Sequence, residues 1–342
     1  MISSIDSVET LETLLSEPAL GVVETMRRLK GDLMFLGVAG KMGPTLARMA
    51  RRASDLAGIP RRIIGVSRFS SAQDENALQK AGIETIRCDL LDEAAVQKLP
   101  NVPNIVYMAG MKFGSTGQES LTWAMNTYLP AVVCKKFSQS RIVAFSTGNV
   151  YGLVPVTSGG SVEGDLPNPM GEYAMSCLGR ERMFEHFSRT LKIPMAIIRL
   201  NYACELRYGV LVDLAQQIAD GKPIDLAMGS FNVLWQADAN AMTLQSFDHV
   251  GSPPLFLNLT GPETLKVRHV CTELAEKMKR PVSFCGTENP SALLNNASQA
   301  FQLFGQPRLS AEQLITLVAE WIGRGGTTLG KPTHFESRDG KF

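Results

Sequence analysis

Residues 33–43 read Leu33-Met-Phe-Leu-Gly37-Val-Ala-Gly40-Lys41-Met42-Gly43, an unbroken apolar run followed by glycines at three-residue spacing. An apolar run without alternation is typical of a central parallel strand. Gly37 permits a tight turn, Gly40 lets backbone N–H groups approach a pyrophosphate, and Gly43 permits close packing of a helix on the strand. Pro44 suits the first turn of that helix, whose N-terminus attracts an anion. The stretch therefore predicts a turn that binds NAD or NADP.

Short apolar runs alternate with longer amphipathic stretches beyond this turn. The expected strands are 33–38, 62–66, 84–88, 104–108, 141–146 and 195–200. Because strands and helices alternate, we expect an α/β fold: a Rossmann-type doubly wound parallel sheet of six strands, with a smaller mixed C-terminal substrate domain.

The chain divides into four expected parts. They are an N-terminal helical extension at 1–30, the dinucleotide-binding Rossmann domain at 31–200, a smaller substrate-binding domain at 201–322 with some segments returning to the Rossmann domain, and a tail at 323–342. The extension reads as two short helices broken near Pro18 and packed on the outside. Further helices are expected at 210–219, 238–247, 265–278 and 311–321, with short strands at 254–259 and 281–285. The tail is rich in glycine and charge, so it is either mobile or a clamp on a neighbouring subunit.

Composition excludes several classes of partner. The formal net charge is +1 with both signs mixed along the chain, so we expect no nucleic acid and no membrane surface as partner. No window holds the 18 or so apolar residues of a membrane span, and acids interrupt the region where a signal peptide needs an apolar core. The expected location is the cytoplasm. The cysteines and histidines lack metal-ligand spacing, so no metal site is expected. A small-molecule substrate remains.

The end of the second predicted strand bears on the choice of cofactor. An acid there usually binds the ribose of NAD, whereas an arginine binds the 2′-phosphate of NADP. Here the strand ends in Ser67 and Arg68, and the nearest carboxylate, Asp74, lies further along. Arg68 can offer a bidentate, charge-assisted contact, so the sequence favours NADP over NAD. Arg68 also reads as a solvated loop residue, which leaves NAD open.

Four further segments carry a family resemblance. They are Cys88-Asp89-Leu90-Leu91-Asp92, Tyr107-Met108-Ala109-Gly110-Met111-Lys112, Ser146-Thr147-Gly148-Asn149-Val150-Tyr151-Gly152 and Tyr173-Ala174-Met175-Ser176-Cys177. Together with the glycine turn they resemble the extended short-chain dehydrogenase/reductase family, also called the NAD-dependent epimerase/dehydratase family, over roughly residues 33–321. The resemblance implies a Rossmann-fold oxidoreductase, epimerase or dehydratase acting on a sugar or sugar-derived acid, and a homodimer through helices at 121–137 and 172–187.

The resemblance also implies roles for single residues. Tyr173 is expected to be the catalytic acid/base, Thr147 to hydrogen-bond the reacting oxygen, and Lys112 to assist catalysis. The expected cofactor-binding residues are Gly37, Gly40, Lys41, Met42, Gly43, Ser67, Arg68, Asp89, Leu90, Ala109, Gly110, Lys112, Asn126, Tyr173 and Leu200. The expected substrate residues are Asn149, Asn201 and Arg207, the last as a bidentate clamp on a carboxylate or phosphate. Asn201 also reads as a turn residue.

One position departs from the family pattern. The family's Y-x-x-x-K motif places a lysine one helical turn after the tyrosine, where it lowers the phenol pKa, but here that residue is Cys177. Without a substitute cation, Tyr173 stays near its ordinary pKa of about 10 and is a poor base at neutral pH. Lys112 is the preferred substitute; Arg180 is a second candidate that also reads as a surface residue. Two functions therefore remain: an enzyme with an atypical site, or an NAD(P)-binding protein with little turnover that serves as a sensor or scaffold.

Overall fold

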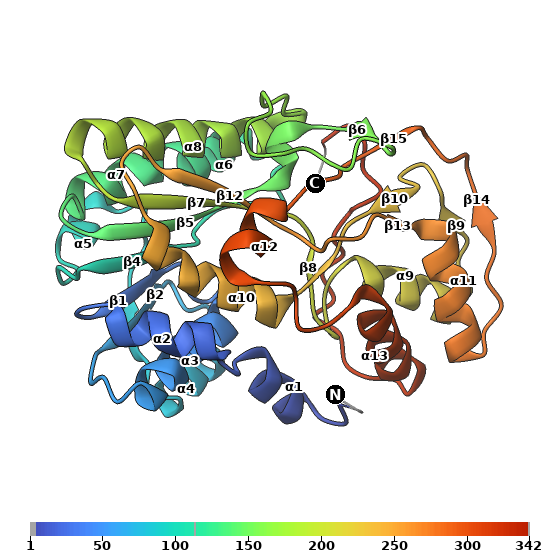
Figure 1. Cartoon of the computed structure of the whole chain (residues 1–342), viewed down its shortest axis with the longest axis horizontal. Helices are drawn as coiled ribbons and strands as arrows, with labels where there is room; N and C mark the ends of the chain where they lie inside the picture. The colour runs from blue at the N-terminus through green and yellow to red at the C-terminus, as the bar shows by residue number, and fades with distance from the viewer. Residues whose placement is uncertain (1–4, 113, 341–342) are drawn as a thin grey trace.

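A parallel β-sheet forms the centre of the molecule, which the computed structural model describes over residues 5–112 and 114–340 (Figure 1). Its seven strands lie in the order β3-β2-β1-β4-β5-β7-β12, and each neighbouring pair is parallel. The strand bounds are β1 Leu33–Leu36, β2 Ile63–Ser67, β3 Glu84–Arg87, β4 Asn104–Tyr107, β5 Arg141–Thr147, β7 Met195–Leu200 and β12 Leu255–Leu259. The strand order reverses between β1 and β4, and such a switch point opens a crevice at the carboxyl edge of the sheet.

The predicted doubly wound sheet is confirmed, with one correction to its size. All six expected strands are present within two residues of their predicted bounds. The sheet has a seventh strand, β12, which we expected as a short strand of the smaller domain. It pairs in register with β7, from Leu255 beside Ala196 to Leu259 beside Leu200. Its inner side chains are fully buried, so the sheet gains apolar contact by recruiting it.

Helices cover both faces of the sheet (Figure 1). Successive residues of β1 point to opposite faces: Leu33 and Phe35 contact one core, Met34 and Leu36 the other. One face carries α5 Glu93–Gln97, α6 Glu119–Trp123, the π-helical turn η1 Ala124–Tyr128, α7 Leu129–Lys136 and α8 Gly171–Leu191. The other carries α2 Leu20–Arg28, α3 Gly43–Leu56, α4 Ala72–Lys80 and α10 Gln236–Gln245.

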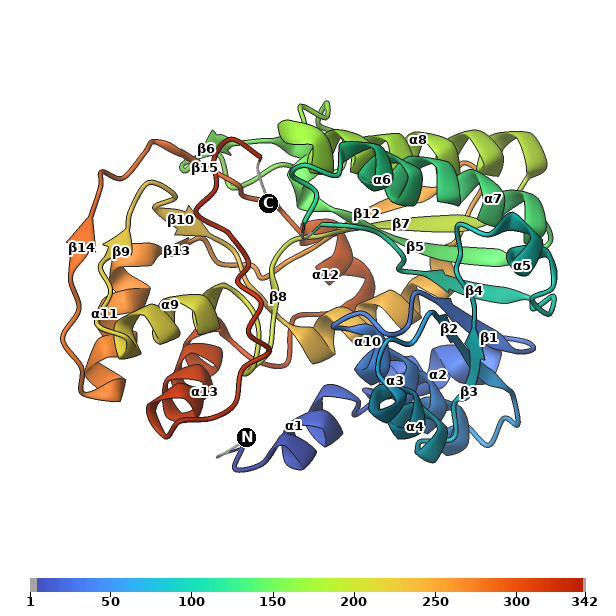
Figure 2. The same ribbon diagram turned by 180° about the vertical axis from the view of Figure 1, so that it is seen from behind.

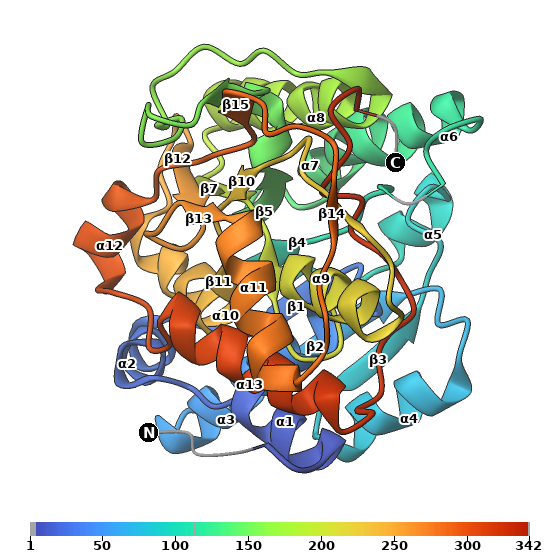
Figure 3. The same cartoon turned by 90° about the vertical axis from the view of Figure 1, so that its right-hand side faces the viewer.

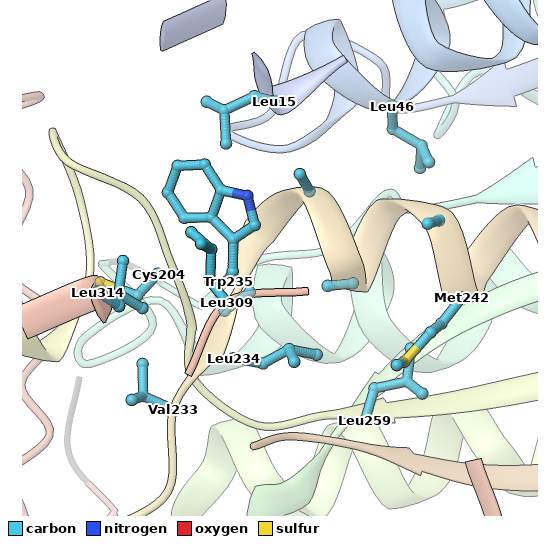
Figure 4. Packing of buried hydrophobic residues seen from close by; sticks show 14 of the residues in the cluster. Leu15, Leu46, Cys204, Val233, Leu234, Trp235, Met242, Leu259, Leu309 and Leu314 are labelled. Carbon is cyan, nitrogen blue, oxygen red and sulfur yellow. The ribbon is translucent and has the colours of Figure 1, made fainter. Parts of the chain in front are cut away.

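The N-terminal extension belongs to the core and is not a peripheral addition. It forms the two expected helices, α1 Val8–Leu15 and α2; residues 1–4 lie outside the described part of the chain. Leu15 is fully buried in the same cluster as Leu46 of α3 and Trp235 (Figure 4). Glu12 of α1 forms ion pairs with both Arg48 and Arg207. The extension therefore ties the glycine-turn helix to the rest of the molecule.

Most of the remaining elements form a smaller lobe, which faces the viewer in Figure 3. Its strands and helices are β6 Val154–Pro155, β8 Ala203–Cys204, β9 Ile224–Asp225, β10 Ser230–Phe231, β11 Leu234–Trp235, β13 Leu265–Lys266, β14 Phe284–Cys285, β15 Ser291–Ala292, α9 Val210–Ala219, α11 Val267–Met278 and α13 Ala311–Gly323. The 3-10 turns η2 Gly148–Tyr151 and η3 Ser246–His249 and the helix α12 Ser298–Phe304 instead contact the sheet or the helices that cover it. The helices expected near α9, α10, α11 and α13 are present; α12 was not predicted. No helix among the described residues is long and apolar enough to cross a membrane.

After α13 the chain runs back across its own surface between the two lobes (Figure 2). We call residues 329–338 the C-terminal strap. Its Leu329 N–H donates to the Arg207 carbonyl at 2.9 Å, and Phe335 is buried with its ring 6.0 Å from that of Phe231. Arg338 donates to the Ser291 carbonyl at 2.7 Å. The predicted tail, whose residues 341–342 lie outside the description, is thus packed on its own chain at the strap.

Candidate functional site

The glycine turn lies at the switch point of the sheet, and its three glycines have different reasons to be glycine. Gly37 has φ +90°, and a Cβ there would lie 2.8 Å from the Ala109 backbone. A Cβ on Gly43 would lie 2.0 Å from the Val38 carbonyl oxygen, because α3 begins there against β1. A Cβ on Gly40 would meet protein no closer than 3.6 Å. The protein's own packing does not require Gly40, which fits a backbone kept bare for a ligand.

A groove made of two adjoining cavities crosses this turn. The smaller, about 330 Å³, is lined by residues that include Gly37, Gly40, Ser67, Arg68, Asp89, Leu90, Ala109 and Gly110. The larger, about 630 Å³, is lined by residues that include Gly40, Lys41, Met42, Gly110, Lys112, Thr147, Asn149, Tyr173, Leu200 and Asn201. Both share Ala39, Gly40, Met108 and Gly110, so they form one continuous groove. Its shape suits an elongated ligand with a diphosphate over the turn.

The two predicted catalytic side chains meet in the larger cavity. Thr147 ends β5 and Tyr173 lies in the first turn of α8. Both side chains line this cavity, and Cys177 follows Tyr173 by one turn of α8. Burial holds the pKa of Tyr173 well above its ordinary value, and Cys177 adds to this, while Arg180 and Thr147 act in the opposite direction. Asn149 donates to the Thr147 hydroxyl at 2.9 Å.

Lys112 lies in the same cavity, as the sequence predicted. Its Nζ is 5.8 Å from the centroid of the Tyr173 ring and donates to the Thr333 carbonyl at 3.3 Å. Burial is the main cause that lowers the pKa of Lys112 to about 8. Lys112 therefore contacts both the strap and the face of the phenol.

Asn126 and Gly43 support the groove without lining it. Asn126 is fully buried in the π-helical turn η1, a feature often found at functional sites. Its side chain bonds both backbone groups of Met111 at 2.9 Å and the hydroxyl of Ser176 at 2.9 Å. Asn126 thereby fixes the loop that follows β4 to helix α8.

Arg180 is buried, so its interpretation as a surface residue is wrong. Only 6% of the residue is exposed, and its guanidinium lines the larger cavity. It donates to the Phe145 carbonyl at 3.0 Å, to the Asn126 carbonyl at 3.4 Å and to the Asn126 side-chain oxygen. Its partners come from β5 and η1, far away in sequence, so helix periodicity alone could not locate it.

Of the predicted substrate residues, Arg207 is not brought to the groove. Its guanidinium is paired with Glu205 at 3.0 Å and with Glu12 at 3.1 Å. These two carboxylates compensate its charge, and Arg207 does not line the larger cavity, so it is not placed to bind a substrate there. Asn201 does line the larger cavity, and its buried Nδ2 has no hydrogen-bond partner among the described residues.

Sequence reasoning missed the residues that close the groove. Gly330, Lys331, Pro332 and Thr333 of the strap line the larger cavity, as does Tyr208. The Lys41 ammonium lies 3.3 Å from the centroid of the Tyr208 ring. Burial, and then repulsion from Lys112 and Lys331, lowers the pKa of Lys41 to about 7. No sequence motif predicts that Lys331, near the C-terminus, lines a cavity formed by residues more than a hundred positions earlier in the chain.

Comparison with known protein families gives one match. Residues 33–228, more than half of the chain, match the family described as "NAD dependent epimerase/dehydratase family". No curated protein sequence matches the chain. No group of ligating side chains among the described residues could hold a metal ion.

Solved structures share the architecture at low sequence identity. UDP-glucose 4-epimerase from Thermotoga maritima, solved with UDP-glucose, superposes with TM-score 0.71 at 15% identity over 86% of this chain and 99% of that one. UDP-glucuronic acid 4-epimerase from Bacillus cereus, in complex with UDP-glucuronic acid and NAD, gives 0.70 at 17% over 86% and 99%. dTDP-glucose 4,6-dehydratase from Bacillus anthracis, in complex with NAD, gives 0.71 at 15% over 86% and 97%.

Proposed function

The chain belongs to the NAD dependent epimerase/dehydratase family, and we propose that it uses a nicotinamide dinucleotide to oxidise, reduce or epimerise a sugar or sugar acid. The observation that carries the proposal is that Tyr173 and Thr147 line the same cavity, which adjoins the glycine turn. When bound, the cofactor would accept or donate a hydride at its nicotinamide ring. Gly40 supports this cofactor, since its backbone is open to a diphosphate.

The residues of the cavity have complementary tasks in this proposal. Thr147 would hydrogen-bond the reacting oxygen of the substrate, and Tyr173 would exchange the proton of that oxygen. Asn149 orients the Thr147 hydroxyl through their 2.9 Å contact. Lys112 places a cation beside the ring of Tyr173, and Asn201 offers an amide to the substrate.

NADP is the cofactor that we propose within this class. Arg68 is exposed at the smaller cavity, and Ser67 lines the same wall at the end of β2. The compared structures that name a cofactor carry NAD, so the choice of NADP rests on Arg68 and Ser67. Titration of both dinucleotides against Arg68→Ala tests it: we expect NADP to lose about tenfold to a hundredfold in affinity and NAD to be unchanged. Tighter NAD binding with no effect of the substitution would reject NADP.

Tyr173→Phe tests the catalytic part of the proposal. On a substrate found with a panel of sugars, sugar acids and their nucleotide esters, we expect turnover at saturating dinucleotide to fall by about 10² to 10⁴. Tyr128→Phe is the matched control, because Tyr128 is exposed and bonds only Glu93 on the surface. Unchanged turnover in Tyr173→Phe would refute the mechanism.

A second candidate is a dinucleotide-binding protein with little turnover. The observation that favours it is the fully buried Cys177, which lies where the family motif has lysine and raises the pKa of Tyr173. Cys177→Lys separates the two candidates. A large gain of activity across the panel would indicate a wild type without efficient catalysis, and loss of an existing activity would indicate a working site adapted to cysteine.

We also propose a homodimer through the outer faces of α6 and α8. Leu121, Trp123 and Met175 on these helices are about two-fifths exposed, an apolar set that a partner subunit would cover. Sedimentation of Leu121→Glu with Met175→Glu tests it: we expect a shift from dimer to monomer. A monomeric wild type would reject the proposal.

A further inference from the structure

Arg180 is a buried cation whose partners are all neutral. Its three hydrogen bonds go to two backbone carbonyls and the amide oxygen of Asn126, and the Tyr107 ring centroid lies 5.9 Å from its Cζ. Within the described part of the chain it forms no ion pair, and the neighbouring Glu181 carboxylate is bonded instead to Arg199 and Ser146. A buried guanidinium without an anionic partner is costly, and it is most stable where an anion forms nearby. The buried position of the guanidinium is therefore best explained by the ionisable groups that lie near it.

Arg180 faces the groups that can become anions. It follows Tyr173 by seven residues and Cys177 by three on α8, so all three lie on one face of the helix. For both the phenol and the thiol, Arg180 is the strongest influence that opposes the rise in pKa caused by burial. Lys112 acts on Cys177 more weakly and is held by the Thr333 carbonyl. Thr147, the other side chain that lowers the phenol pKa, carries no charge.

The loop after β4 is shaped around this guanidinium. A Cβ on Gly110 would lie 2.3 Å from Nη2 of Arg180 and 2.9 Å from the side-chain oxygen of Asn126. Gly110 does not have a positive φ, so its backbone conformation does not require glycine. Glycine is required because a Cβ would occupy the space of the Arg180 guanidinium. Two separate segments of the chain, the β4 loop and η1, are thus fitted to hold one side chain.

We propose that Arg180 is the positioning residue that stabilises the Tyr173 phenolate during proton transfer, in place of a cation at residue 177. The proposal rests on the function above, in which Tyr173 exchanges the proton. In the oxidative direction the substrate O–H bond breaks and its proton goes to the phenolate oxygen, while the carbon-bound hydrogen leaves as hydride to the oxidised nicotinamide. Arg180 stabilises the charged phenolate before the transfer and faces a neutral phenol after it.

The ionisation of Tyr173 can be measured without any substrate. The protein is produced with difluorotyrosine, whose phenol is more acidic than that of tyrosine, and fluorine NMR follows each ring through a pH titration. Tyr173→Phe assigns the signal. We expect the midpoint of this signal to move to higher pH in Arg180→Gln, to stay near that of wild type in Arg180→Lys, and to change less in Lys112→Gln. Cys177→Lys combined with Arg180→Gln should lower the midpoint again relative to Arg180→Gln alone.

Gly110→Ala provides an independent variant in case Arg180→Gln does not fold. Its added methyl group displaces the guanidinium without removing the charge, so the midpoint should again rise. Equal midpoints in wild type, Arg180→Gln and Gly110→Ala would overturn the proposal, as would a midpoint that responds to Lys112→Gln and not to Arg180. The titration needs neither cofactor nor turnover. Equal midpoints in these variants would therefore refute the role of Arg180 whether or not the proposed enzymatic function is correct.

Discussion

The carboxylate of Asp213 accepts two hydrogen bonds from Thr333, one from its backbone N–H at 2.7 Å and one from its hydroxyl at 2.5 Å. Asp213 lies in the first turn of α9, and Thr333 lies in the strap. The Thr333 carbonyl accepts the Lys112 hydrogen bond at 3.3 Å. One residue of the strap therefore links the smaller lobe to the loop after β4, across the cavity that holds Tyr173.

Thr333→Val should loosen the strap. The substitution removes the hydroxyl bond to a carboxylate, which is worth about 1.5–3 kcal/mol. We expect amide hydrogen exchange over 329–338 to speed up about tenfold or more, with little change in α8. Thr328→Val, at an exposed position nearby, is the control. Unchanged exchange in Thr333→Val would mean that other contacts hold the strap.

Gly40→Ala and Gly43→Ala should separate ligand binding from folding. A Cβ on Gly43 overlaps the Val38 carbonyl, so Gly43→Ala should lower the free energy of unfolding by about 3 kcal/mol or more. A Cβ on Gly40 meets only ordinary contacts, so Gly40→Ala should fold normally and bind dinucleotide at least tenfold more weakly. Urea denaturation and dinucleotide titration measure the two effects. If Gly40→Ala bound dinucleotide normally, the diphosphate would not bind against the Gly40 backbone.

Local patterns predicted the sheet well because each strand is encoded by its own residues. The glycine turn and its flanking strand indicated the location of the groove, and the motifs around Thr147 and Tyr173 pointed to two side chains that line it, our proposed catalytic pair. Long-range contacts were not predictable in this way. Strand β12 belongs to the sheet because it pairs with β7, about sixty residues earlier in the chain. Arg207 forms an ion pair with Glu12 of the N-terminal helix α1.

The same limit explains Arg180 and the strap. On a helical wheel Arg180 is an ordinary polar position, and only the β5 carbonyl and the Asn126 amide make it a buried one. The strap lacks periodicity because side chains of other segments, such as Asp213, hold it in place. Sequence patterns therefore locate residues whose environment is local, and they fail where partners come from distant segments.

Lys41 should make stability depend on pH. Its folded pKa of about 7 lies below the value of about 10.4 expected for the unfolded chain. Between these values the unfolded state binds more protons, so stability should rise with pH from about 7 upward, and the full penalty should apply below 7. Lys41→Met should flatten this rise in thermal denaturation and stabilise the protein near pH 6. Lys98→Met, an exposed control, should not. A rise that persists unchanged in Lys41→Met would assign it to other groups, such as Lys112.

Arg199 of β7 and Glu181 of α8 form a buried, two-pronged ion pair with contacts of 2.8 and 3.0 Å. Glu181 also accepts from Ser146, the residue before Thr147. Arg199→Met should lower the free energy of unfolding by about 3–5 kcal/mol, because it leaves the carboxylate buried and uncompensated.

Arg199→Met combined with Glu181→Leu should recover most of that loss, since two apolar side chains then replace two charges. The exposed pair of Arg62 and Glu84 is the matched control, and Arg62→Met should cost no more than about 1 kcal/mol. Urea denaturation of the wild type and these three variants measures the differences. If the double variant were as unstable as Arg199→Met alone, the cost would come from lost packing around β7 and not from the unpaired charge.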